Sequence, residues 1–165
     1  MDATRLKSYE EFLEFMKHQQ LPHAVDAVNR IVELPCKGAP LPGNLYIKWH
    51  QTVPFLQLVH FMVEGVPDAR VGALETALIR LNNVYEVPGF GYDHRSHRLY
   101  YRLVVPVLPD DGISVTTLIA MGSGCVKAAK EFLEGFKAVL DGQPGEDIET
   151  IVANIARARK AASTL

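Results

Sequence analysis

Apolar residues in the first part of the chain recur at the spacing of one helix face. Four of them share that face: Phe12, Leu13, Phe15 and Met16. Ser8 and Glu11 precede them with capping-box spacing, in which the hydroxyl accepts a backbone N–H and the carboxylate reaches back. Pro22 has no amide hydrogen and crowds the preceding turn. We therefore predict a helix that begins at Ser8 and ends before Pro22.

Residues 24–34 fit two periods at once. Val28, Arg30, Val32 and Leu34 alternate with their neighbours as in a strand, whereas Val25, Val28 and Val32 have helical spacing. The pattern leaves both structures open. Three prolines and two glycines then mark a loop: Pro35, Gly38, Pro40, Pro42 and Gly43.

The middle of the chain is rich in β-branched and aromatic residues, which predicts strands at 45–51 and 55–64. A helix follows from Asp68, a favourable N-cap residue, to Leu81, and Asn82-Asn83 ends it. Strands at 87–92 and 98–107 then flank a polar turn and form a hairpin. In the second of these strands apolar and polar residues alternate, so one face of the sheet is expected to contact water in part.

The pattern predicts a long helix at 114–140, capped by Ser114. Ala120, Gly124 and Ala128 are small residues four positions apart, so another backbone can approach closely along that stripe. Two interpretations stay open: a tight crossing or bend within the chain, or a contact between two subunits. We take Ala120, Gly124 and Ala128 as the candidate dimer interface.

A break at 142–145 precedes a last predicted helix at 146–163. Acidic residues lie in its first turn and basic residues in its last, which complements the helix dipole. They are Glu146, Asp147 and Glu149 at the start and Arg157, Arg159 and Lys160 at the end. Its apolar stripe consists of Ile148, Ile151, Val152 and Ile155. This stripe is expected to pack on the body of the domain or on a partner.

The predicted order is α-β-β-β-α-β-β-α followed by a C-terminal helix. This order favours an α+β fold, with helices packed on an antiparallel sheet of about five strands. A chain of 165 residues with 48% hydrophobic and 22% charged residues fits one globular domain. We expect residues 1–141 to form the core of this domain, with the helix at 146–163 attached to it.

The charge and the cysteines narrow the class of protein. A net charge of -2 disfavours a role in binding nucleic acid, which normally requires a basic excess. Cys36 and Cys125 are too few for a disulfide scaffold and are expected to be free thiols. The chain has no apolar run of the roughly 18 residues that span a membrane, and its N-terminus does not resemble a signal peptide. We expect a cytoplasmic protein.

Three groups of residues could suggest a metal site, a catalytic nucleophile or a dinucleotide loop, but none has the full pattern of such a site. His94 and His97 are three apart in a turn, but a stable metal site needs three or four ligands. Cys125 follows Gly122-Ser123-Gly124, yet this segment lies within a helical pattern, unlike a nucleophile elbow. Gly89-Phe90-Gly91 lacks the third glycine of a dinucleotide loop. We therefore predict no catalytic residue, no metal and no cofactor.

One cluster of polar side chains suggests a partner. Arg95, Arg98, Tyr100 and Arg102 lie on one predicted hairpin. Arginine beside tyrosine is typical of contact hot spots in protein interfaces and also of single-stranded nucleic-acid binding. A solvated sheet face is the alternative for the same four residues.

The middle of the chain has a distinctive order of motifs, in which a strand at 55–64 enters a helix that ends in Leu81-Asn82-Asn83. A hairpin then carries Gly91-Tyr92 and residues 99–103, and residues 109–114 lead into the long amphipathic helix. With these motifs, the run from Leu56 to Leu140 resembles the YbjN-like family, whose fold is similar to that of type III secretion chaperones. The resemblance implies an antiparallel sheet with packed helices, a homodimer, and the binding of an extended segment of a client protein without catalysis. The function predicted is therefore a chaperone-like or regulatory protein-binding domain, and the alternative is a nucleic-acid-binding module at 95–102.

Overall fold

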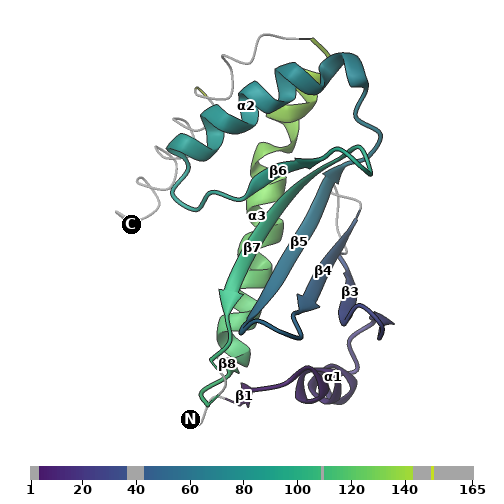
Figure 1. The fold of residues 1–165 in the computed structure, drawn as a ribbon, viewed down its shortest axis with the longest axis vertical. Coiled ribbons are helices and arrows are strands. Elements are labelled where there is room, and N and C mark those ends of the chain that lie inside the picture. Colours follow the sequence, from purple (N-terminus) through teal and green to yellow (C-terminus); the bar gives the residue numbers. More distant parts are fainter. Residues whose placement is uncertain (1–3, 37–42, 109, 143–149, 151–165) are drawn as a thin grey trace. The chain divides into compact units, whose positions relative to one another are not determined.

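The computed structural model describes residues 4–36, 43–108, 110–142 and 150. These residues form three α-helices, one 3₁₀-helix and eight strands (Figure 1). In chain order they are β1 (Arg5–Leu6), α1 (Tyr9–His18), β2 (Ala24–Asp26), β3 (Ile31–Pro35), β4 (Asn44–Trp49), β5 (Phe55–Val63), η1 (Asp68–Arg70), α2 (Val71–Val84), β6 (Phe90–Asp93), β7 (Arg98–Pro106), β8 (Ile113–Ser114) and α3 (Val115–Leu140). The helix predicted at 146–163 lies outside the described residues, apart from Thr150.

The α+β class is confirmed. Six strands form an antiparallel sheet in the order β2-β3-β4-β5-β7-β6, with helices packed on it. A separate two-stranded ribbon pairs β1 with β8, so the start of the chain lies beside the start of α3. Side chains of β4 and β5 alternate between buried and half-exposed, as expected for a sheet whose second face contacts water in part.

Residues 24–34 form a hairpin, neither a single strand nor a helix. β2 pairs with β3 around a turn that Asp26 stabilises, because its carboxylate accepts hydrogen bonds from the backbone and side chain of Asn29. Arg30 then adopts a positive φ of 52°, which reverses the chain. The extra strand explains why the sheet has six strands where about five were predicted.

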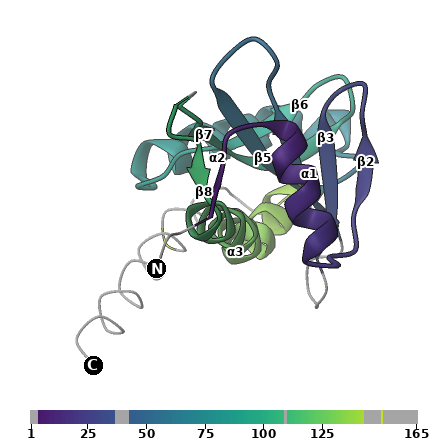
Figure 2. The ribbon, with the colours of Figure 1, turned by 90° about the horizontal axis from the view of Figure 1, so that it is seen from below.

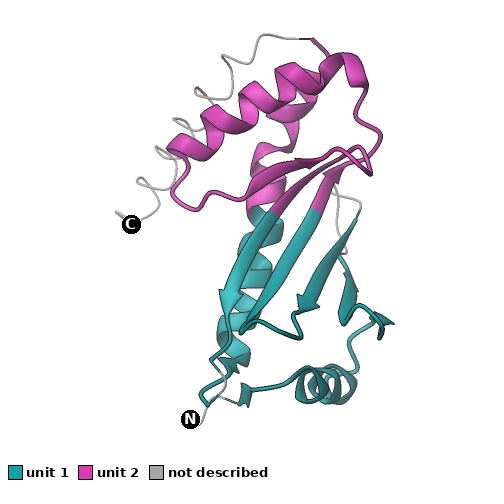
Figure 3. Cartoon of the chain, in the orientation of Figure 1, with its two compact units in different colours: residues 1–60, 102–127 teal, residues 61–101, 128–165 magenta. Residues whose placement is uncertain are grey.

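The chain divides into two compact units (Figure 3). Unit 1 comprises residues 1–60 and 102–127, and unit 2 comprises residues 61–101 and 128–165. The largest fully buried side chains of unit 1 are Phe12, Met16, Leu56, Leu58 and His60. In unit 2 they are Leu74, Leu81, Leu99, Tyr101, Phe132 and Phe136.

Two of the predicted helix caps form in the structure, and the third does not. The Ser8 hydroxyl accepts a hydrogen bond from the Glu11 backbone N–H, and the Glu11 carboxylate accepts one from the Lys7 backbone N–H. The Ser114 hydroxyl likewise accepts from the Thr117 N–H. The prediction for Asp68 is wrong: it begins the short 3₁₀-helix without capping it, and its carboxylate lies 3.4 Å from the His97 ring.

Candidate functional site

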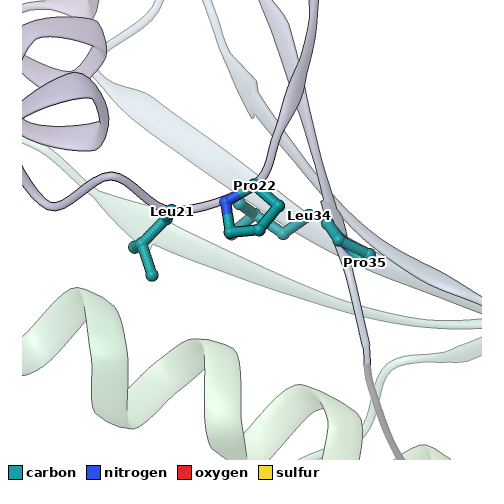
Figure 4. A pocket seen from close by; sticks show the side chains of 4 residues that line it. All are labelled: Leu21, Pro22, Leu34 and Pro35. Carbon is teal, nitrogen blue, oxygen red and sulfur yellow. The ribbon is translucent and has the colours of Figure 1, made fainter.

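Unit 1 contains an apolar pocket beside α1. It has a volume of about 330 Å³ and is lined by Leu21, Pro22, Leu34 and Pro35 (Figure 4). Leu21 and Pro22 lie on the segment that leaves α1, and Leu34 and Pro35 end β3. The pocket presents no charged side chain among these four residues, so it suits an apolar ligand group.

Local backbone geometry holds the pocket open. α1 ends at His18, and Gln20 takes a positive φ of 51°, which turns the chain away from the helix axis. The Leu21 carbonyl contacts the His23 ring at 2.6 Å, and Pro22 between them cannot donate to a helix or strand. On the facing side, Leu34 pairs in register with buried Leu45 of β4. One wall is therefore formed by the turn after α1 and the other by the strand pairing of β3.

The edge of the sheet lies directly beside this pocket. β2 follows Pro22 and His23, and it is the first strand in the order of the six-stranded sheet. All three of its residues are exposed, and among the described strands only β3 pairs with it. Val25 is 44% exposed and lies opposite fully buried Val32, so it is on the apolar side of the hairpin. Val28, in the turn that follows, is 84% exposed.

The Arg30 side chain connects the β2–β3 hairpin to α1. The Arg30 guanidinium lies 5.4 Å from the centroid of the Tyr9 ring and 3.5 Å from the Glu10 carboxylate. The Arg30 carbonyl also accepts a hydrogen bond from the Trp49 N–H. In Figure 2, α1 lies on the side of unit 1 that carries β2 and β3. The pocket and the exposed edge strand are adjacent in unit 1, and we call them together the edge groove: Leu21, Pro22, Val25, Leu34 and Pro35.

The sequence did not single out the edge groove. Pro22 and Pro35, at the two ends of residues 22–35, were its only signals. A pattern of alternating residues does not show which strand will lie at the edge of a sheet.

Three of the four predicted partner-binding residues lie in unit 2. Arg98 stacks on Phe61 with its guanidinium 4.0 Å from the ring centroid, and it lies 3.9 Å from the Glu64 carboxylate. Tyr100 meets the same ring edge-on, with 6.4 Å between centroids. It also covers Gly91, where an added Cβ would lie 2.5 Å from the tyrosine ring. The structure therefore brings Arg98 and Tyr100 together on one aromatic cluster.

The other two residues lie elsewhere on the hairpin. Arg95 is exposed in the turn, and its backbone N–H donates to the Asp93 carboxylate. Arg102 is exposed on the part of β7 that belongs to unit 1.

The predicted dimer stripe on α3 has two exposed members and one buried member. Ala120 and Gly124 are exposed in unit 1, and nothing lies within 4 Å of the position that a Gly124 Cβ would take. Ala128 is only 3% exposed, in unit 2. Gly122 faces the sheet instead, where a Cβ would lie 3.2 Å from Leu45. The two glycines thus differ: Gly122 allows close packing on the sheet, and Gly124 leaves a free surface.

The two turn histidines each contact a carboxylate. His94 Nε2 lies 2.9 Å from Glu75 Oε1, and His97 Nδ1 lies 3.4 Å from Asp68 Oδ1. Tyr92 lies between the two rings, and its hydroxyl is 3.1 Å from His97 Nδ1. Across the described part of the chain, no group of three or more His, Cys, Asp or Glu residues is arranged to hold a metal ion.

The cysteine thiols are unsuited to nucleophilic chemistry. Cys125 is fully buried in unit 1, and burial raises its pKa to about 12. Burial also raises the pKa of Cys36. A nucleophilic thiol needs a lowered pKa, because the thiolate is the reactive form.

Comparisons with known proteins agree with the fold. No helix among the described residues is long and apolar enough to cross a membrane. No protein-family model matches the chain, and no curated protein matches it, so the YbjN-like assignment stays a prediction. The chain does match a solved structure, a chain of the HopA1–SchA chaperone–effector complex, with a TM-score of 0.54 and 17% identity. The match covers 76% of this chain and 94% of that one, and it shows that the two chains share a fold.

Proposed function

We propose that this protein is a non-enzymatic, chaperone-like or regulatory domain that binds an extended segment of another polypeptide at the edge groove. The observation that carries the proposal is the apolar pocket directly beside an exposed edge strand. An extended chain can pair its backbone with such an edge, while its alternate side chains fill a neighbouring pocket. The matched structure comes from a chaperone–effector complex, which supports a protein ligand.

The register of β2 indicates which client side chains the groove accepts. Val25 lies opposite buried Val32, and Ala24 and Asp26 lie on the other face. A client strand added to β2 therefore places every second side chain on the apolar side of the groove. Burying one leucine-sized group there contributes roughly 1.5–3 kcal/mol before the cost of ordering the client.

Leu34→Asp is expected to weaken client binding at least about tenfold, because it places a charge in the pocket wall. The probe is an array of immobilised random peptides of about 15 residues. Wild-type protein is expected to select peptides with apolar residues at alternate positions. The Leu21→Asp variant is expected to lose binding to these same peptides. Val104→Asp, on an exposed strand position of the same unit, is the matched control and should retain it.

Two outcomes would contradict the proposal. One is a Leu34→Asp variant that is folded and selects the same peptides as the wild type. The other is an absence of peptide binding together with retention on single-stranded oligonucleotides that falls steeply with salt. The second outcome would favour the nucleic-acid alternative at Arg95, Arg98, Tyr100 and Arg102. The Arg98 guanidinium is already engaged within the chain, over the Phe61 ring and 3.9 Å from the Glu64 carboxylate, which weighs against this alternative.

The proposal includes a cytoplasmic homodimer whose contact uses the exposed part of the α3 stripe, Ala120 and Gly124. Gly124→Leu is expected to convert the dimer into a monomer, as measured by the mass in solution. The monomer itself should be as stable as before or more so, because the site is open and glycine costs a helix about 1 kcal/mol.

The neighbouring glycine provides the control for this experiment. Gly122→Leu should destabilise unit 1 directly, because its side chain would meet Leu45 and Leu58. An unchanged mass for Gly124→Leu would remove the α3 contact from the proposal and leave the edge groove untouched.

A further inference from the structure

The outward face of α2 carries a stripe of exposed small residues that leads to one exposed apolar side chain. That side chain is Ile79, which is 64% exposed among the described residues. Gly72 and Thr76 precede Ile79 at helical spacing, and both are exposed. Nothing lies within 4 Å of the position that a Gly72 Cβ would take. Such small residues leave room for the backbone of a second helix.

The chain leaves α3 beside the start of this helix. Gly142 contacts Arg70, since an added Cβ would lie 2.7 Å from the guanidinium Nη2 atom. Arg70 immediately precedes Val71, the first residue of α2. Residues 143–145 can span only about 10–14 Å when fully extended. The N-terminal end of α2 is therefore within reach of a segment that begins at Glu146.

The sequence of that segment matches the stripe in spacing. Its apolar positions are Ile148, Ile151, Val152 and Ile155. They have the same spacing of one and two helical turns as Gly72, Thr76 and Ile79. In a parallel arrangement Ile148 would lie beside Gly72 and Ile155 beside Ile79.

The charges favour the same direction. Acidic residues begin the segment, where Arg70 and the positive end of the α2 dipole lie. Basic residues follow from Arg157 onward, about 17 Å along a helix that starts at Glu146. Exposed Glu86 and the negative end of the α2 dipole lie at the corresponding end.

From these observations we infer that residues 146–160 dock along the outward face of α2 in the same chain, parallel to α2 and with Ile155 against Ile79. The docked segment completes the hydrophobic packing of unit 2. This role is independent of the edge groove in unit 1.

Disulfide trapping tests the predicted register. In a full-length Cys36→Ser background, Ile79→Cys and Ile155→Cys are expected to form an intrachain disulfide under mild oxidation, seen as faster migration on a non-reducing gel. Buried Cys125 stays inert in the folded protein. The control pair, Ile119→Cys with Ile155→Cys, uses an exposed position on α3 in unit 1 and should give no such product.

A covalent dimer as the main product would show that the segment of a second copy covers α2, and it would overturn the intrachain assignment. The absence of any crosslink would overturn the docking itself.

Hydrogen exchange supplies a second measurement that needs no cysteine. In the wild type, the amides of residues 148–156 are expected to exchange at least about tenfold more slowly than those of an unstructured peptide. Ile79→Asp should remove this protection, and because Ile79 is exposed the rest of unit 2 should keep its own. Ile119→Asp should change neither. Equal protection of 148–156 in Ile79→Asp and in the wild type would refute the contact.

Discussion

Acidification from about pH 7.5 to 5.5 is expected to lower the free energy of unfolding through His60. This side chain is fully buried in unit 1, and neither ring nitrogen has a hydrogen-bond partner among the described residues. Burial lowers its pKa below the ordinary value of 6.5, and the nearby Asn44 backbone opposes the shift only in part. The Cys125 thiol interacts with the His60 backbone, and because burial raises the pKa of this thiol to about 12 it offers no counter-charge.

The sign follows from proton uptake. Below about pH 6.5 the unfolded chain binds a proton at His60 that the folded chain excludes, so unfolding becomes easier. The contribution of neutral His60 to the free energy of unfolding is complete above pH 6.5. As the pH falls further, this contribution is lost at up to about 1.4 kcal/mol per pH unit, until the pH reaches the pKa of His60 in the folded state. Asp26 and Asp93 have lowered pKa values because their side chains accept hydrogen bonds, so they titrate below this window.

Denaturant unfolding at three pH values between 7.5 and 5.5 measures this effect. His60→Leu keeps a side chain of similar size and removes the titration, so its stability should change much less with pH. The difference between the two curves cancels the contributions of the exposed histidines. Parallel curves for wild type and His60→Leu would show that His60 does not carry the pH dependence.

Phe90→Ala is expected to cost about 3–5 kcal/mol, the range for removing a buried aromatic ring from a core. Phe90 is 5% exposed, and its ring lies 4.5 Å from that of Tyr101, 5.1 Å from Phe132 and 5.6 Å from Phe136, between centroids. The backbone beside it is held by Asn82, whose side chain bonds both the N–H and the carbonyl of Phe90. Losing the ring therefore loosens β6, α2 and the second half of α3 together.

Two variants calibrate this loss. Phe90→Leu retains most of the volume and should cost well below the alanine variant. Val87→Ala removes apolar atoms from an exposed position of the same unit and should stay within about 0.5 kcal/mol. A loss below about 1 kcal/mol for Phe90→Ala would mean that these four aromatic rings do not form the core of unit 2.

The sequence predicted those parts of the fold that depend on neighbouring residues. The Ser8 and Ser114 caps, the strands around Phe55 and the long helix after Ser114 all follow from local spacing. The hairpin at 24–35 did not follow, because its turn depends on the positive φ of Arg30 and on a side-chain bond between Asp26 and Asn29. Asp68 was misassigned because its carboxylate contacts a histidine 29 positions later in the chain.

The candidate site was harder to predict than the fold. Arg98 and Tyr100 share a cluster as expected, but the ring that joins them, Phe61, comes from another strand. On α3, simple spacing placed Ala128 in line with Gly124, whereas the packing of unit 2 buries it. The edge groove depends on which strand ends the sheet, and only the strand order determines that.

The two outermost strands of the sheet also limit how these molecules associate with one another. β2 has three residues and β6 has four, and each ends in an aspartate that accepts hydrogen bonds from the turn after it. Short, charged edges resist the endless strand-to-strand addition that produces fibres. Because both carboxylates keep their charge to unusually low pH, this protection should persist in acid. A sheet whose edge strands are open to pairing is thereby kept from polymerising through the same edges.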